Sequence, residues 1–374
     1  MTLRQTLAEL VAFDSVSSRT NASVIDYLEA RCRAIGFRLQ RFPYTDDHGV
    51  EKINLLASSS ADLSAVELIL VGHTDTVPFD PAWTDALTLK ESDGKLFGRG
   101  ACDTKAFITA ALTAMQNVDR QSLRRPFALL FTADEEIGLI GAKRFSALKP
   151  LKAKFALVGE PTSLQPIRGG KGYCLAEITV GGREAHSAYP ALGTSAINGA
   201  SRLISRIEQI ATNMQSEARQ DFDPPFTTLN IGLIQGGTAK NVIPGRCSFT
   251  LEWRPIPGQD ANFLLTKIEA AVAEEAARDP NLTFKIDASR ADAGFETSAH
   301  SRLVTLMKNL TGRASGTVAF GTEAAQMAEL GAEAVVFGPG NIRDAHRTGE
   351  FVPVAELERC AEILTAAIDA FCVA

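Results

Sequence analysis

Cysteine is scarce in this sequence: the chain has six among 374 residues, widely spaced and without a C-x-x-C pair. Such spacing argues against a disulfide framework, and we expect reduced, mostly buried thiols. The first residues contain no long apolar segment of the kind that secretory signals carry. Apolar stretches elsewhere, such as residues 66–71, are much shorter than a membrane span. We therefore expect a cytoplasmic protein that does not enter a membrane.

An excess of positive charge is also lacking. The formal net charge is −6, and Lys and Arg are scattered along the chain. Nucleic-acid-binding proteins typically carry a clustered basic patch, so we expect no nucleic-acid partner. The hydrophobic share of 45% and the charged share of 22% are ordinary for a globular protein. A chain of this length favours two domains.

The N-terminal part of the chain alternates between two apolar patterns. Apolar residues recur at helical spacing in some segments and form short continuous runs in others, as buried strands do. In chain order these segments are residues 3–13, 22–37, 67–71, 104–118, 126–131, 139–148 and 155–158. Helices that alternate with strands predict an α/β fold with a mostly parallel sheet covered by helices on both faces.

The middle of the chain has a different pattern. Strand-like and helical segments follow one another as a small α+β unit, at residues 173–180, 195–213, 227–234, 247–253, 261–277 and 282–286. The βαβ style then resumes, with a helix at residues 301–310, a strand at 335–338 and a long helix from Val354. We predict a discontinuous first domain, residues 1–172 and 289–374, interrupted by an inserted domain at residues 173–288.

The sharpest local signal is G-H-T-D-T-V-P at residues 72–78, directly after an apolar strand. Side chains alternate along an extended segment, so His73 and Asp75 point the same way. A metal-bound imidazole usually donates its other N–H to a carboxylate, and this spacing suits such a pair. A histidine and an aspartate that merely share a strand-end turn explain this fragment equally well.

Other acids and a second histidine also lie at element ends. Asp103 precedes the helix that begins near residue 104, where it could simply be a cap. Residues 134–136, D-E-E, end a buried strand, where adjacent acids are costly without a cation; a solvated acidic helix start is the alternative. Glu160 and His346 follow two further strands.

Together these positions predict a metal centre. Ligands of parallel sheets gather at the carboxyl ends of the strands. Four strand ends would each deliver a side chain there, with Asp103 at an adjacent helix start: His73, Glu135 or Glu136, Glu160 and His346. Two imidazoles and three carboxylates suit a pair of zinc-like ions with one carboxylate between them. Five unrelated caps and turns are the less economical explanation.

The sequence resembles the M20 family of metallopeptidases and deacylases. The motifs that carry the resemblance are GHTDTVP, GRGACDTKA, TADEEIG, GEPT, GREAHSAYP and AHRTGEFV, in the order of the family and across nearly the whole chain. The resemblance implies a catalytic domain of the zinc-exopeptidase type. It also implies that the insertion is a lid domain, which this family often uses to form a homodimer.

The same resemblance implies a ligand set for two divalent metal ions. His73, Asp103 and Glu160 would hold one zinc ion, and Asp103, Glu136 and His346 would hold the other, with Asp103 as the bridge. Cobalt or manganese would suit the same ligands.

Three further residues receive catalytic roles from the resemblance. Glu135 would be the general base, Asp75 would orient His73, and His186 in the lid would donate to the developing oxyanion across a dimer interface. Glu135 as an additional metal ligand, and His186 as an ordinary surface residue, are the alternatives.

The branch of the family is indicated by residues 252–258, 321–324 and 338–341, which look most like acetylornithine deacetylases. That likeness implies hydrolysis of N2-acetyl-L-ornithine, an N-acyl amino acid, in arginine biosynthesis. Candidate substrate-binding residues are Arg254 for the substrate carboxylate, Asn241 for the acyl carbonyl, Glu323 for the ornithine ammonium, and its neighbour Thr322. A strand-end arginine, a turn asparagine and a helix cap explain these residues equally well.

Two other functions fit parts of the pattern. A succinyl-diaminopimelate desuccinylase, another N-acyl amino acid deacylase, or a dipeptidase or carboxypeptidase of the same family would share the metal chemistry. A metal-dependent binding module without turnover would share the ligands, although it would not need Glu135 as an unligated base.

Overall fold

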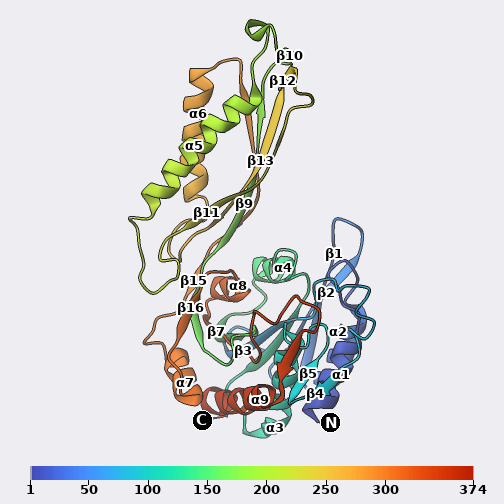
Figure 1. Ribbon diagram of the computed structural model, residues 1–374. Helices are drawn as coiled ribbons and strands as arrows, with labels where there is room; N and C mark the ends of the chain where they lie inside the picture. The colour runs from blue at the N-terminus through green and yellow to red at the C-terminus, as the bar shows by residue number, and fades with distance from the viewer. Residues whose placement is uncertain (1, 374) are drawn as a thin grey trace. The chain divides into compact units, whose positions relative to one another are not determined.

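The chain, described by a computed structural model for residues 2–373, divides into two compact units. Unit 1 comprises Met1–Arg168, Glu296–Gly316 and Thr322–Ala374, and unit 2 comprises Gly169–Phe295 and Thr317–Gly321. The chain therefore forms most of unit 1, continues through unit 2 and returns to complete unit 1, as the colours in Figure 1 show.

The nine-stranded sheet, most of which lies in unit 1, is mostly parallel at its centre. Its strand order is β1 (Arg38–Thr45), β2 (Glu51–Ser58), β6 (Phe127–Thr132), β3 (Val66–His73), β7 (Ala153–Val158), β17 (Glu333–Val336), β8 (Ile167–Gly170) and β15 (Phe295–Glu296), with β16 (Gly316–Val318) beside β8. Strands β6, β3, β7 and β17 run parallel, whereas β1 and β2 form an antiparallel hairpin that joins β6. The predicted mostly parallel α/β sheet is confirmed.

Helices cover both faces of this sheet because the parallel strands carry apolar side chains on both sides. Five helices pack on one face: α1 (Leu3–Ala12), α2 (Ala22–Ala34), α3 (Lys105–Asn117), α7 (Arg302–Thr311) and α9 (Val354–Ile368). Their buried residues belong to one core cluster with strand residues such as Leu68, Leu70 and Leu129. Helices α4 (Ile140–Leu148) and α8 (Ala324–Glu329) contact β2, β7 and β17 on the opposite face (Figure 1).

A small accessory sheet in unit 1 was not predicted. It consists of β4 (Lys90–Ser92), β5 (Lys95–Phe97) and β18 (Phe351–Pro353), in the order β18, β5, β4. Short single-turn elements complete the unit: η1 (Arg120–Ser122) and η3 (Asp369–Val373). The pairing of β18 with β5 brings the C-terminal part of the chain beside the segment that leads to Asp103.

Unit 2 is an antiparallel sheet with helices packed on it. The strand order is β11 (Thr228–Gly236), β13 (Arg246–Arg254), β9 (Tyr173–Gly181) and β14 (Thr283–Asp292). Residues of α5 (Ala196–Met214) and α6 (Phe263–Arg278) share one core with alternate residues of these strands. The remaining elements are β10 (Ala185–His186), η2 (Pro190–Leu192) and β12 (Val242–Ile243). Polar and apolar side chains alternate along β9 and β13, as expected for a sheet with one solvated face.

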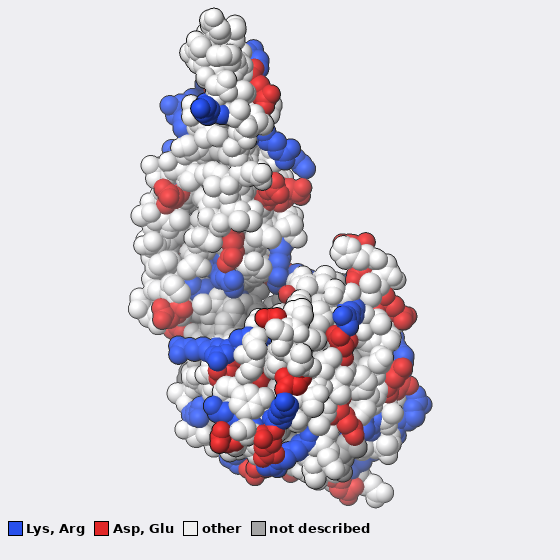
Figure 2. Space-filling model, turned by 45° about the vertical axis from the view of Figure 1, so that its right-hand side comes forward, with Lys and Arg blue, Asp and Glu red and all other residues white. Residues whose placement is uncertain are grey.

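All six cysteines are free and buried, as expected from their spacing. No helix within residues 2–373 combines the length and the apolar character that crossing a membrane requires. On the face shown in Figure 2, acidic and basic side chains are interspersed rather than segregated by sign.

Candidate metal centre

The carboxyl ends of the parallel strands deliver the predicted side chains to one edge of the sheet. His73 is the last residue of β3, residues 134–136 follow β6, and Glu160 follows β7. Because β6, β3 and β7 are parallel neighbours, these positions lie side by side.

The carboxylate of Asp103 lies between two imidazoles. Its Oδ1 is 3.1 Å from Nε2 of His73, and its Oδ2 is 2.9 Å from Nε2 of His346. The N-cap of α3 is Thr104 rather than Asp103, so the aspartate does not cap this helix. Asp103 thus has the position of a carboxylate shared between two sites.

Two groups of three ligand atoms meet at this aspartate. One group is His73, Asp103 and Glu160, and the other is Asp103, Glu136 and His346; within each group the ligand atoms lie within 4.8 Å of one another. Nε2 of His346 is also 3.1 Å from Oε1 of Glu136. Nitrogen and carboxylate oxygen are the donors that zinc and similar divalent ions take, so the residues fit a dinuclear centre.

The electrostatics of the cluster favour a cation. Burial raises the pKa of Glu135 and of Glu160 well above the ordinary value, and burial also raises the pKa of Glu136. Hydrogen bonds with Asp103 and Glu136 raise the pKa of His346 to about 10. Carboxylates that burial and mutual repulsion force toward the neutral form become favourable ligands once a divalent ion supplies the missing charge.

The carboxylate of Asp75 lies closer to the turn that follows β6 than to the imidazole of His73. Its Oδ1 accepts a hydrogen bond from the backbone N–H of Glu135 (3.1 Å), and its Oδ2 accepts one from Glu136 (3.3 Å) and another from the Ser17 hydroxyl (2.7 Å). Nδ1 of His73 lies 3.0 Å from the carbonyl oxygen of Asp75 but 3.6 Å from its carboxylate. The backbone of Asp75 therefore orients the imidazole, while its carboxylate holds the turn that carries Glu135 and Glu136.

The first acid of the D-E-E segment anchors this turn from the other side. Asp134 is fully buried, and its Oδ1 lies 2.8 Å from Nζ of Lys52. The Tyr44 hydroxyl donates to its Oδ2 at 2.9 Å. A solvated acidic helix start does not describe Asp134, since α4 begins only at Ile140 and the residue is inaccessible to solvent.

Sequence reasoning missed buried charged residues near the centre, among them Lys52 and Glu350. Lys52 was not singled out, although it holds Asp134. Glu350 lies inside one of the motifs that mark the family resemblance, yet no role was assigned to it; its carboxylate is fully buried and pairs with Arg99 at 2.6 Å. An acidic residue beside a glycine is typical of a surface turn, so no local signal identified it.

Three predicted residues lie in unit 2. His186, in β10, is exposed, and its Nδ1 accepts a hydrogen bond from the N–H of Ala188 at 3.1 Å. Asn241 is exposed before β12. Arg254 ends β13, where its guanidinium lies over the ring of Tyr173, 4.6 Å from the centroid, and Nε donates to Glu252 at 2.8 Å.

Thr322 and Glu323 are both buried at the start of α8. The Thr322 hydroxyl accepts a hydrogen bond from the N–H of Ala324 at 3.3 Å, although the N-cap of α8 is Glu323 rather than Thr322. Burial raises the pKa of Glu323 to about 7, and its Oε1 is one of the buried oxygens without a hydrogen-bond partner.

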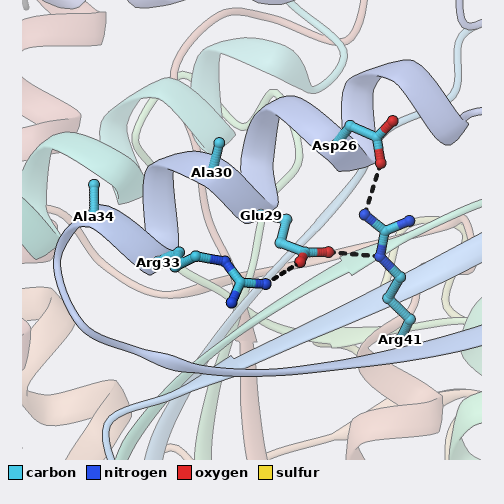
Figure 3. Close-up of a pocket in the computed structure, with 6 residues that line it drawn as sticks. All are labelled: Asp26, Glu29, Ala30, Arg33, Ala34 and Arg41. Carbon is cyan, nitrogen blue, oxygen red and sulfur yellow. Dashed lines mark hydrogen bonds and ion pairs between the residues drawn. The ribbon is translucent and has the colours of Figure 1, made fainter.

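A shallow groove elsewhere on unit 1 carries none of these ligands. It lies between α2 and β1, and Figure 3 shows its side chains. Glu29 pairs with Arg33 and with Arg41 (2.5 Å), and Arg41 also pairs with Asp26 (2.6 Å). Because these charges neutralise one another, we assign the groove no function.

Comparison with known proteins gives consistent matches over almost the full length. Residues 69–370 match the peptidase family M20/M25/M40. The chain is 51% identical over 372 residues to an acetylornithine deacetylase from Myxococcus xanthus, covering 99% of this chain and 97% of the relative. It is 36% identical over 372 residues to an acetylornithine deacetylase from Klebsiella pneumoniae strain 342, covering 97% and 96%.

Solved structures share the fold. A tripeptidase from Staphylococcus aureus matches with a TM-score of 0.79 at 24% identity, covering 99% of this chain and 97% of that one. A dinuclear metal binding peptidase of the M20 family from Bacillus subtilis matches with a TM-score of 0.71 at 13% identity, again covering 99% and 97%.

Proposed function

The chain belongs to peptidase family M20/M25/M40, and from that premise we propose that it hydrolyses the amide bond of N2-acetyl-L-ornithine, releasing L-ornithine and acetate. The observation that carries the proposal is the full-length similarity to acetylornithine deacetylases. The Asp103 carboxylate, shared between the two groups of ligand atoms, supports the same reaction class. We also propose that the enzyme is cytoplasmic and serves arginine biosynthesis.

We propose that the centre holds two zinc ions. His73, Asp103 and Glu160 would hold one, and Asp103, Glu136 and His346 the other, with Asp103 as the bridge. When bound, such a pair lowers the pKa of a water and polarises the carbonyl of the amide.

In this proposal Glu135 moves the proton. It belongs to neither group of ligand atoms, yet it neighbours the ligand Glu136 in sequence. Burial raises the pKa of its carboxyl well above the ordinary value, which suits a group that accepts a proton and then releases it. Glu135 would take the proton of the attacking water and give it to the departing amine of ornithine. Asp75 would keep Glu135 in place through the backbone contacts of this turn.

A substrate panel tests the proposed function. Amine release from N-acetylornithine, N-succinyl-diaminopimelate, acetylmethionine and a dipeptide is measured with zinc or cobalt and after chelation. We expect metal-dependent hydrolysis with the highest kcat/KM for acetylornithine. A higher kcat/KM for another compound would keep the metal chemistry and contradict the substrate. Bound metal without turnover on any of them would favour a binding module.

We propose that His186 donates a hydrogen bond to the oxyanion that develops on the acyl carbonyl. Its side chain is exposed and stands in the motif that marks the lid of this family. Removing one such donor typically costs about a hundred- to a thousand-fold in kcat, so His186→Ala should lose activity on that scale with its metal content unchanged. Loss of less than about tenfold would contradict the role. His300→Ala, at another exposed histidine, is the matched control.

Glu323 is the proposed partner of the substrate ammonium. Its Oε1 atom is buried and has no hydrogen-bond partner, so it could accept a hydrogen bond from the substrate ammonium. Because Glu323 is buried, substitution is needed to test whether the substrate reaches it. Glu323→Ala should lower kcat/KM for acetylornithine by about tenfold or more relative to acetylmethionine, which has no ammonium on its side chain. Equal losses on the two substrates would remove this role. Arg254 and Asn241 remain proposed partners of the substrate carboxylate and the acyl carbonyl.

We propose a homodimer formed through unit 2. Strand β11 is at the edge of its sheet, and Leu233 and Ile234 on it are 70% and 59% exposed. An exposed apolar edge strand is a ready surface for pairing with a second copy. Sedimentation of the purified chain should therefore give the mass of two chains, and the mass of one chain would contradict the proposal.

A further inference from the structure

Glu350 is brought beside the Asp103 segment by the accessory sheet. It directly precedes β18, and β18 pairs with β5 in antiparallel register, Phe351 opposite Phe97. The N–H of Gly98, just after β5, donates to the carbonyl oxygen of Glu350 at 3.0 Å. The segment from Gly98 to Asp103 therefore folds around the side chain of a residue far away in the sequence.

Both carboxylate oxygens of Glu350 accept hydrogen bonds from this segment. Oε2 accepts from the N–H of Gly100 (3.1 Å) and from Nη1 of Arg99 (2.6 Å). Oε1 accepts from the N–H of Cys102 (2.9 Å) and of Asp103 (3.0 Å). The last of these amides belongs to the residue whose carboxylate lies between the imidazoles of His73 and His346.

A carboxylate is the side chain that this position requires. The segment is neither helix nor strand, so its buried N–H groups need an acceptor from elsewhere in the chain. An ionised carboxylate has only acceptor sites and enough of them for four donors. An amide of the same shape would turn an NH₂ group toward one pair of these donors. Arg99, itself 2% exposed, balances the buried charge.

We propose that Glu350 is a positioning residue of the metal centre, which fixes the backbone at Asp103 so that each carboxylate oxygen faces one ligand group. The inference rests on the proposed function only in that Asp103 bridges two metal ions. Glu350 does not contact the ligand atoms through its own side chain; it acts through the N–H of Asp103.

The test compares Glu350→Gln with a matched control, Glu275→Gln. Glu275 is also buried and paired with an arginine, Arg202 at 2.9 Å, but it lies on α6 in unit 2. Both variants lose a buried charge and should unfold at lower temperature than the wild type. Only Glu350→Gln should weaken zinc affinity, measured by competition with a coloured chelator, by about 10- to 100-fold, as loss of an outer hydrogen bond to a ligand does. Its kcat should fall with KM changed less than about threefold, because no substrate contact is removed.

Zinc binding as tight as in the wild type, with a stability loss like that of Glu275→Gln, would overturn the proposal. Hydrogen exchange of the metal-free wild-type protein provides a second measurement that does not depend on a folded variant. The amides of Gly100, Cys102 and Asp103 should be protected, and exchange as fast as in an exposed loop would equally overturn it. A wild type that binds two zinc ions without releasing acetate would contradict the deacetylase function, while the zinc titration would still decide the role of Glu350.

Discussion

Replacement of Glu135 by glutamine should lower kcat for acetylornithine by about a hundred- to ten-thousand-fold, the range that a general acid–base group contributes. Glutamine keeps the size of the side chain but cannot take the proton of the attacking water. KM should change little, because the proposed substrate contacts are made by other residues. Steady-state kinetics and metal analysis of the same preparation are the measurements.

The metal content of the Glu135→Gln variant shows whether Glu135 is a general base or a metal ligand. Two ions per chain with a large loss of kcat is the expected result, since Glu135 lies in neither group of ligand atoms. Loss of an ion would mean that Glu135 is a ligand, and near-normal turnover would mean that another group takes the proton. Glu329→Gln, which changes an exposed carboxylate on α8 paired with Ser146, is the control and should retain wild-type kcat.

Replacement of Lys52 by methionine should lower the free energy of unfolding of unit 1 by about 3–5 kcal/mol, the usual cost of leaving a buried charge without its partner. Lys52 and Asp134 are both almost completely inaccessible to solvent, and of the donors Lys52 and Tyr44 to the aspartate, Tyr44 would remain. Because Asp134 directly precedes Glu135, kcat should fall as well. Denaturant unfolding of the metal-free protein, followed by a probe in unit 1, measures the first effect.

The double variant Lys52→Met/Asp134→Leu tests whether the unpaired buried charge causes the loss of stability. Removing both charges should restore part of the lost stability, because no unpaired charge then remains buried. A double variant as unstable as the sum of the two single variants would contradict the ion-pair explanation. Lys285→Met, at a highly exposed pair with Asp287, should leave the free energy of unfolding nearly unchanged.

The central strands of the fold could be predicted from the sequence because each is marked by a local run of apolar residues. Buried parallel strands read as continuous apolar runs, and β3, β6 and β7 were recognised on that basis. His73 and Glu160 could be placed together because strand ends of a parallel sheet share one edge. At the end of β6, Glu136 rather than Glu135 belongs to a group of ligand atoms, which agrees with the predicted ligand set, and the metal role of Glu136 stays a prediction.

The hairpin of β1 and β2 could not be predicted because its polar residues are satisfied only by tertiary contacts. Asn54 is buried in β2, where its amide donates to the carbonyl oxygen of Gly141 (2.8 Å) and accepts from the N–H of Ala133 (3.0 Å). Lys52 is buried in the same strand by its pair with Asp134. A strand that buries lysine and asparagine does not give the alternating apolar pattern on which recognition depends.

The role of Glu350 could not be predicted either, because it also depends on tertiary contacts. The Glu350 carboxylate accepts hydrogen bonds from backbone amides of the segment from Gly100 to Asp103. Because every residue other than proline has such an amide, the sequence does not show which amides need an acceptor. The family motifs placed it near His346 in the sequence, but only the pairing of β18 with β5 brings it to Asp103.

Zinc titration of the metal-free enzyme, with acetate release from acetylornithine and bound zinc measured on the same samples, tests the dinuclear deacetylase most directly. We expect no turnover without metal, and activity that reaches its maximum when each chain holds two ions. Full activity after chelation, or two bound ions per chain without acetate release, would contradict the account.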